Sequence, residues 1–166
     1  MQIIHYPDRV LSRQSKPVRE VDREVLDRAH EMLELMYESD GIGLAGPQVG
    51  WSRRIITLDV DQDRKGERIF INPRIIEREG QMEGEEGCLS LPGMSLAVPR
   101  AAKVKVAAYT PKGERLEIDA DGLHAAAWQH ELDHLDGLLI INRADPADIL
   151  AVSRQLRKLE KEGRND

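Results

Sequence analysis

Residues 129–134 read Gln-His-Glu-Leu-Asp-His and contain the pattern H-E-x-x-H. In an α-helix, positions four apart differ by about 40° around the axis and about 6 Å along it, so His130 and His134 can direct their rings at one ion. Glu131 is turned about 100° from His130, which lets it transfer protons beside the ion rather than bind it. The spacing predicts a helix with two metal ligands and a general base, although the same pattern also arises by chance in proteins that bind no metal.

A catalytic zinc-type site needs a third protein ligand and keeps one position open for water or substrate. The metzincin pattern requires a third histidine at the position where this chain has Ile140. A thermolysin-like enzyme uses a downstream glutamate, but Glu160 and Glu162 lie among Lys and Arg residues that are typical of a solvated helix face. Neither pattern therefore supplies the third ligand.

Cys88 is the single cysteine of the chain, so it cannot form an internal disulfide. A free cysteine is more often a small core residue than a ligand. However, Gly87 permits close approach of the backbone, and Pro92-Gly93 turns the chain shortly afterwards. This setting suits a side chain presented at the edge of a cleft, and the residues alone leave both interpretations open.

Three separated motifs together resemble the signature motifs of the peptide deformylases, in their order and at similar spacing. They are Gly-Ile-Gly-Leu-Ala-Gly-Pro-Gln at 41–48, Glu-Gly-Cys-Leu-Ser at 86–90 and Gln-His-Glu-Leu-Asp-His at 129–134. The likeness covers most of the chain. It implies that Cys88, His130 and His134 hold one divalent metal ion with a water in the fourth place. The implied ion is Fe(II), with zinc or nickel able to replace it.

The resemblance also implies a reaction, namely removal of the N-formyl group from the N-terminal formylmethionine of newly made polypeptides, with release of formate. The metal-bound water would be the nucleophile and Glu131 the general base and acid. The Gln48 amide and the Leu89 backbone N–H would stabilise the oxyanion. The residues implied to bind substrate are Ile42, Gly43, Glu86, Gly87, Leu123, Ala126 and Ala127.

Two other functions remain as alternatives. A zincin-type endopeptidase would cleave internal peptide bonds and would be indifferent to Cys88. A catalytically dead metal-binding module would need neither Glu131 nor Gln48. The chain also departs from the family pattern at Ser95, where a larger basic residue is common, and at Gly46, where Ala is commoner. The contacts to later substrate residues are therefore left open.

The length and composition of the chain indicate its domain organisation and its cellular compartment. With 166 residues, 40% hydrophobic and 33% charged, we expect one catalytic metallohydrolase domain over 1–166, with fraying after about residue 162. No apolar run approaches the roughly 18 residues of a membrane span. The N-terminus lacks the sections of a signal peptide, and a single thiol suits the reducing cytoplasm.

The formal net charge of −6 argues against general or direct sequence-specific nucleic-acid binding. The expected partner is instead the nascent formyl-Met polypeptide. A weak ribosome contact through the C-terminal helix remains a prediction, which rests on four basic residues: Arg154, Arg157, Lys158 and Lys161.

Periodicity predicts the elements around the H-E-x-x-H segment. Helical spacing predicts helices over 23–38, from residue 122 to a stop at Gly137, and from Asp145-Pro146 onward. Alternation predicts strands over 54–60, 67–71, 72–76 and 138–141, and a hairpin of 98–109 with 116–120. The predicted fold class is α+β, with short antiparallel strands packed around a central H-E-x-x-H helix, an N-terminal helix and a C-terminal helix.

Overall fold

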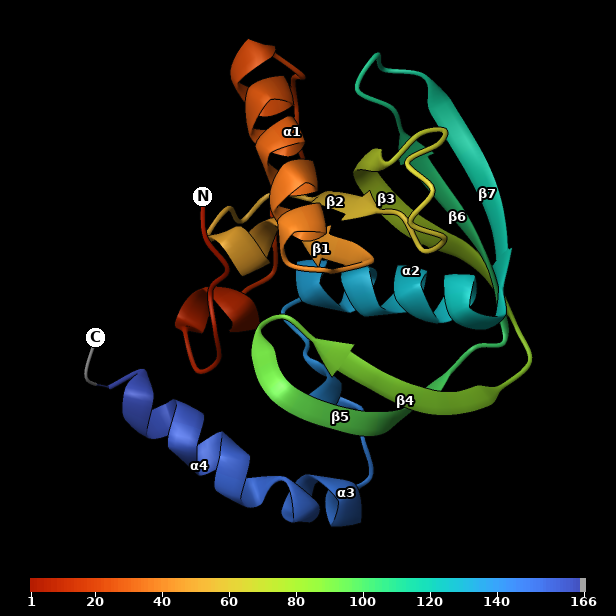
Figure 1. Cartoon of the computed structure of the whole chain (residues 1–166). Coiled ribbons are helices and arrows are strands. Elements are labelled where there is room, and N and C mark those ends of the chain that lie inside the picture. The colour runs from red at the N-terminus through yellow and green to blue at the C-terminus, as the bar shows by residue number, and fades with distance from the viewer. Residues whose placement is uncertain (165–166) are drawn as a thin grey trace.

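The computed structural model describes residues 1–164 and has the predicted α+β architecture (Figure 1). The α-helices are α1 (Arg23–Glu38), α2 (Gly122–Leu135), α3 (Pro146–Ala151) and α4 (Ser153–Glu162). Three short 3-10 helices are η1 (Arg9–Ser12), η2 (Gly46–Val49) and η3 (Ile140–Asn142). The strands are β1 (Gly43–Ala45), β2 (Ile55–Leu58), β3 (Ile69–Glu79), β4 (Met82–Cys88), β5 (Leu91–Arg100), β6 (Lys103–Tyr109) and β7 (Arg115–Asp121).

The strands form two antiparallel sheets with α2 between them. One sheet has the order β1-β2-β3-β6-β7, and the other is the β4-β5 hairpin. Figure 1 shows α2 lying across the middle of the molecule, with the larger sheet on one side and β4-β5 on the other. The H-E-x-x-H helix is therefore central, as the sequence predicts.

Helix α1 begins where the sequence predicts because Asp22 caps it. The Asp22 carboxylate accepts a hydrogen bond from the Val25 backbone N–H at 2.9 Å. Its apolar stripe packs on the larger sheet, where Ile55 faces α1 and the adjacent Ile56 faces α2. Strand β2 is buried on both faces, which explains its continuous apolar run. The buried stripe of α1 is Ala29, Met32, Leu33 and Met36.

Helix α2 is buried over most of its length, so it places polar side chains inside the protein. Trp128 packs edge-on against Phe70 of β3, with ring centroids 4.7 Å apart. Small Ala125 and Ala127 let the helix lie close to its neighbours. The helix ends at Leu135, and Gly137, the predicted stop signal, follows two residues later with φ +78°.

Two strand predictions are wrong in their boundaries. The expected break at Asn72-Pro73 does not occur, and β3 runs through it. Asn72 has φ +50°. Its side-chain Oδ1 accepts a hydrogen bond from the Val18 N–H, and its Nδ2 donates one to the Val18 C=O, both at 2.8 Å. The segment that contains Val18 therefore holds the Asn72 side chain in place. The strand predicted over 98–109 is divided, because β5 ends at Arg100 and β6 begins at Lys103. The hairpin of β6 with β7 is confirmed.

The C-terminal part differs in two places from the prediction. Residues 138–141 form no strand; Leu138 and Leu139 lead into η3. Asp145 caps the next helix through the Ala147 N–H at 2.8 Å, as predicted, but this helix is divided into α3 and α4 at Val152. Of the segment expected to fray after residue 162, residues 163–164 form a turn, and 165–166 lie outside the described residues. No helix within residues 1–164 is long and apolar enough to span a membrane.

Gly137 joins α2 to the chain that follows it, and its conformation leads to a stability prediction. A Cβ there would lie 2.7 Å from the Ser12 carbonyl oxygen, in addition to the strain of a positive φ. Gly137→Ala should therefore lower the free energy of unfolding by clearly more than the cost of about 1–2 kcal/mol for a left-handed residue. Urea unfolding measures this free energy.

Gly113→Ala is the matched control. Gly113 has φ +83°, but a Cβ there would meet no atom within 4 Å. This variant should show only the backbone cost. Equal losses in the two variants would mean that the contact with Ser12 contributes nothing.

Candidate metal centre and catalytic cleft

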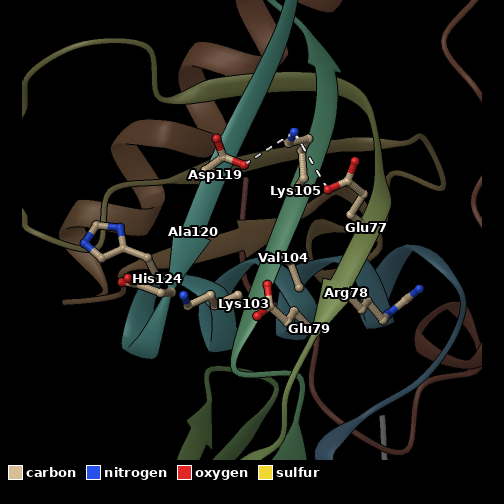
Figure 2. Close-up of a pocket in the computed structure, with 10 residues that line it drawn as sticks. Glu77, Arg78, Glu79, Lys103, Val104, Lys105, Asp119, Ala120 and His124 are labelled. Atoms are coloured by element: carbon tan, nitrogen blue, oxygen red, sulfur yellow. Dashed lines mark ion pairs between the residues drawn. The ribbon is translucent and has the colours of Figure 1, made fainter.

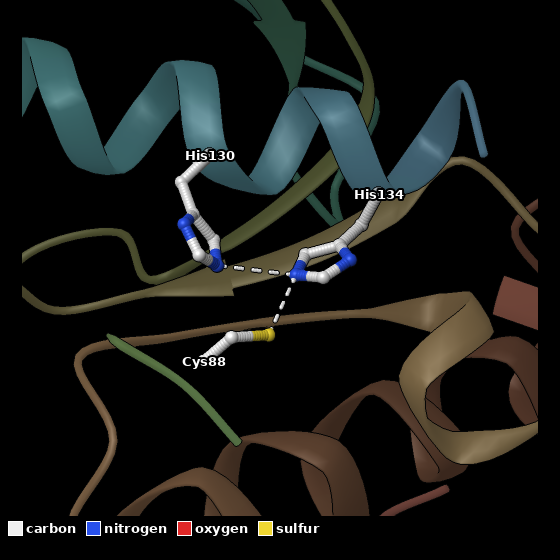
Figure 3. A group of neighbouring side chains, drawn as sticks. All are labelled: Cys88, His130 and His134. Carbon is white, nitrogen blue, oxygen red and sulfur yellow. Dashed lines mark hydrogen bonds between the residues drawn. The ribbon is translucent and has the colours of Figure 1, made fainter. Parts of the chain in front are cut away.

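Three potential metal ligands converge from two elements (Figure 3). Cys88 is the last residue of β4, and His130 and His134 lie one turn apart on α2. Nε2 of His134 is 3.4 Å from Sγ of Cys88 and 3.1 Å from Nε2 of His130. The three donor atoms all lie within 4.8 Å of one another. The fold therefore brings Cys88 to the histidine pair across more than 40 residues of sequence.

These three side chains fit a metal ion. In a tetrahedral zinc-type site with bonds of about 2.0–2.3 Å, ligand atoms lie about 3.3–3.7 Å apart, close to the two distances found here. Hydrogen bonds satisfy the group less well, because two ring nitrogens face each other and at most one proton fits between them. One thiolate and two imidazoles form a donor set for borderline ions such as zinc and iron.

The surroundings favour a positively charged His130 and a neutral His134. Burial alone would lower the pKa of His130, but hydrogen bonds with Cys88 and Glu86 and the charge of Glu131 raise this pKa well above its usual value. Burial, with help from the charges of His130 and Arg100, lowers the pKa of His134 well below its usual value. A neutral imidazole keeps the lone pair that a metal ligand needs.

Glu131 is a buried carboxyl group beside the ligands. It is 4% exposed, and burial raises its pKa from the usual 4.5 to about 7. Its Oε2 has no hydrogen-bond partner among the described residues. Its other oxygen, Oε1, fills the space where a Cβ of Gly43 would lie. Gly43 therefore makes room for the carboxyl group, which is suited to exchange protons near neutral pH.

The Gln48 amide is held in a single orientation. Its Oε1 accepts a hydrogen bond from the Ala45 backbone N–H at 2.9 Å, so the nitrogen must point the other way. Nε2 donates to Ser90 Oγ at 3.2 Å and lies 3.6 Å from Cys88 Sγ. Gln48 is 1% exposed. The fold therefore directs a neutral donor at the space beside the ligands, and the neighbouring Ser90 was not singled out from the sequence.

Glu86 was expected to bind substrate, but its carboxylate is hydrogen-bonded to His130 and Arg100. His130 Nδ1 donates to Glu86 Oε1 at 2.8 Å, and Arg100 donates to both Glu86 oxygens at 2.8 and 2.9 Å. Burial would raise the pKa of Glu86, but these bonds hold it below its usual value. Such a partner fixes the tautomer and orientation of a ligating histidine. Two further charged residues in this network, Asp133 and Arg143, were not identified from the sequence.

A cleft of about 510 Å³ lies in front of these groups. The structure brings every sequence-predicted site residue except His134 to its wall; His134 lies deeper, 1% exposed. Leu123 is 64% exposed. Two acidic residues not predicted for the site, Asp40 and Glu85, also line the cleft. The predicted residues on the wall are Ile42, Gly43, Gln48, Glu86, Gly87, Cys88, Leu89, Leu123, Ala126, Ala127, His130 and Glu131.

A larger hollow of about 860 Å³ lies over β3, β6 and β7 (Figure 2). Charges of both signs line it, and Lys105 Nζ lies 3.8 Å from Glu77 and 3.9 Å from Asp119. His124 lies here, with Nε2 3.1 Å from Asp61 Oδ1, and so lies apart from the ligand pair. Within residues 1–164, the group of Cys88, His130 and His134 is the one metal-ligand cluster found.

The fold and this site define a small α+β protein with a candidate metal centre that faces a cleft. The chain belongs to the polypeptide deformylase family, whose sequence model matches residues 1–149. A peptide deformylase of Chromobacterium violaceum is 43% identical over 162 residues, which cover 98% of this chain and 97% of that protein. A peptide deformylase of Neisseria gonorrhoeae is 44% identical over 161 residues, covering 97% and 96%.

Solved structures agree with this family assignment. A peptide deformylase from Plasmodium falciparum superposes with a TM-score of 0.93 at 38% identity, covering 99% of this chain and 98% of that one. Peptide deformylase 1B from Arabidopsis thaliana gives a TM-score of 0.94 at 33% identity, covering 99% and 93%. The resemblance of the three motifs is therefore confirmed, and the chain is an enzyme of this family.

The space at Gly43 predicts a catalytic defect. Gly43→Ala should displace the Glu131 carboxyl group and lower kcat by about 100-fold, the typical effect of a misplacement of about 1 Å. Metal content, measured by elemental analysis, should remain unchanged. Gly84→Ala, where a Cβ meets nothing within 4 Å, is the control. A normal kcat for Gly43→Ala would show that the carboxyl position is not critical.

The raised pKa of Glu131 predicts a pH-dependent stability. The folded pKa of about 7 lies above the usual 4.5, so the stability from this group is complete below about pH 4.5 and lost as the pH rises through 7. With metal removed by a chelator, Glu131→Gln should be more stable than the unchanged chain at pH 8, by up to about 3 kcal/mol. At pH 4.5 this advantage should vanish.

Thermal unfolding of both chains at the two pH values measures the difference. Glu34→Gln, on the exposed face of α1, controls for the general effect of removing one negative charge. The same stability difference at both pH values would contradict the assigned effect of burial.

Proposed function

We propose that this chain removes the formyl group from the N-terminal formylmethionine of newly made polypeptides and releases formate, with one divalent metal ion held by Cys88, His130 and His134. The observation that carries the proposal is the convergence of these ligands beside a buried carboxyl group and an oriented amide. A structural metal site would need neither Glu131 nor Gln48.

The ligand set suits Fe(II), with zinc or nickel as replacements, because a thiolate and two imidazoles bind borderline ions well. When bound, the divalent ion supplies Lewis-acid chemistry, lowering the pKa of a water molecule and polarising the formyl carbonyl. The protein holds the ion through the end of β4 and two successive turns of α2.

Two protein groups act on the reacting atoms in this proposal. Glu131 takes a proton from the attacking water and passes it to the departing amine nitrogen, a role for which a pKa near neutrality is suitable. The Gln48 Nε2 donates to the developing oxyanion without adding charge. The backbone N–H of Leu89, a residue on the cleft wall, is the proposed second donor.

The cleft would bind the substrate through an apolar wall and polar backbone. Ile42, Leu123, Ala126 and Ala127 surround a space suited to the methionine thioether. The backbone of Ile42, Gly43 and Gly87 pairs with the peptide chain. Glu86 acts indirectly, through His130.

The proposed substrate class supports a location in the cytoplasm, where new polypeptides are made. Neither membrane association nor direct nucleic-acid recognition is part of the proposal, in keeping with the net charge of −6. Four basic side chains are exposed on α4 and support at most a weak ribosome contact: Arg154, Arg157, Lys158 and Lys161.

Formate release tests the proposal. The chain, prepared anaerobically with Fe(II), should release formate from a formyl-Met tripeptide. Glu131→Ala should lower kcat by at least about 1,000-fold with metal retained, because the proton-transfer group is lost. Cys88→Ala should lose metal and activity together. His124→Ala, outside the cleft, should retain both.

Three outcomes would reject the proposal. Near-normal turnover of Glu131→Ala would remove the assigned base. Cleavage of internal peptide bonds that does not depend on Cys88 would indicate an endopeptidase. Metal bound at full occupancy without formate release would indicate a binding module.

A further inference from the structure

Four charged side chains form one continuous network behind the metal ligands. Arg143 donates to Asp133 through NH2 at 2.9 Å and Nε at 3.2 Å. Arg100 donates to Asp133 through NH1 at 2.6 Å and to Glu86 through its other two nitrogens. Glu86 then holds Nδ1 of His130. The network thus joins Arg143, half-exposed, to a metal ligand.

The four side chains carry two negative and two positive charges, and Glu86 also faces His130. The Arg100 side chain is 4% exposed, and the side chains of Glu86 and Asp133 are 11% and 12% exposed. Arg100 is shared between the two carboxylates, and of these two Glu86 also has His130 as a partner. Arg143, whose side chain is 46% exposed, supplies the second positive charge. Removing one partner of a buried ion pair leaves the other uncompensated, which is costly.

The position of Arg143 is set by the segment after α2. Its backbone N–H bonds the Ile140 carbonyl at 3.0 Å, and the Asn142 side chain closes the same turn by accepting from the Leu139 N–H at 2.8 Å. The turn η3 therefore folds this part of the chain back toward Asp133, which is on α2. The segment expected to be a strand instead carries an arginine to the rear of the site.

We propose that Arg143 is a positioning residue for the metal ligand His130. Arg143 donates hydrogen bonds to both oxygens of Asp133. Two of the three Arg100 nitrogens can therefore donate to Glu86. Without Arg143, the Asp133 carboxylate has Arg100 as its one cationic partner and competes with Glu86 for it. Glu86 then orients the His130 ring less tightly, and the metal dissociates more readily. The inference rests on the metal binding proposed above.

Arg54 offers a matched control. It also ties the end of α2 to the rest of the molecule, with NH1 2.8 Å from Asp136 Oδ1 and 3.3 Å from the Leu135 carbonyl oxygen. Within residues 1–164, its partner Asp136 makes no hydrogen bond with Arg100, and Arg54 does not line the cleft. Loss of Arg54 should therefore weaken the packing of the same helix without disturbing Glu86.

Co(II) provides a readout that does not depend on activity. Each variant is loaded with Co(II), its visible bands are recorded, and its dissociation constant is measured by competition with a chelator. Arg143→Met should weaken Co(II) binding by about 10-fold and shift the bands. A loss of this size is at the lower end of what is typical when a residue that supports a metal ligand is changed. Arg143→Lys restores the charge but not the two-pronged contact, so it should be intermediate. Arg54→Met should lose stability and leave both readouts unchanged.

A double variant tests whether the effect passes through Glu86. In a Glu86→Gln background, Arg143→Met should change Co(II) affinity by less than about 2-fold, because the coupling between the two residues is already broken. The inference is overturned if the full effect persists in that background, or if Arg143→Met gives the same affinity and spectrum as Arg54→Met. Failure of the unchanged chain to show a thiolate–Co(II) band would instead refute the metal site itself, and the inference with it.

Discussion

The burial of α2 between the two sheets is the constraint on which the rest of the structure depends. A helix in this position is surrounded by protein, so every polar side chain on it needs a partner or a function. Trp128 and the small alanines supply the apolar contacts that hold the helix. Glu131 and His134 are thereby buried and His130 is mostly buried, and the low dielectric around them strengthens each charge interaction.

The charges on α2 are balanced by groups from other parts of the chain. Cys88 from β4 faces the histidine pair at the front, and Arg100 from β5 meets the carboxylates behind it. Both residues come from the β4-β5 hairpin, so this small sheet contributes a ligand and the counter-charge that orients another ligand. The hairpin therefore supplies functional groups from the last residue of each of its strands, although it adds only a few residues to the core.

Chemical grouping rather than size distinguishes the functional cleft. The larger hollow over β3, β6 and β7 is lined mostly by charged side chains, and there Lys105 pairs with Glu77 and Asp119. The smaller cleft combines an apolar wall with donor and acceptor groups that point into it, including the Gln48 amide fixed by the Ala45 N–H. Gly43 also contributes to this cleft, because the Glu131 carboxyl group occupies the space that a side chain at residue 43 would fill.

The sequence by itself determined the features that depend on neighbours within a turn or two: the bounds of α1, the cap at Asp145, the hairpin of β6 with β7, and the spacing of His130 and His134. Periodicity and capping are local, so they can be read from adjacent residues. Resemblance of three motifs added Cys88 and Gln48, which no local rule could place beside the histidine pair and Glu131. Only the tertiary structure decided the continuity of β3, the turn η3, the engagement of Glu86 with His130 and the ion pairs of Asp133. These depend on contacts between segments far apart in the sequence, such as Asn72 with Val18 and Arg100 with Asp133, whose partners are chosen by the packing of the whole chain.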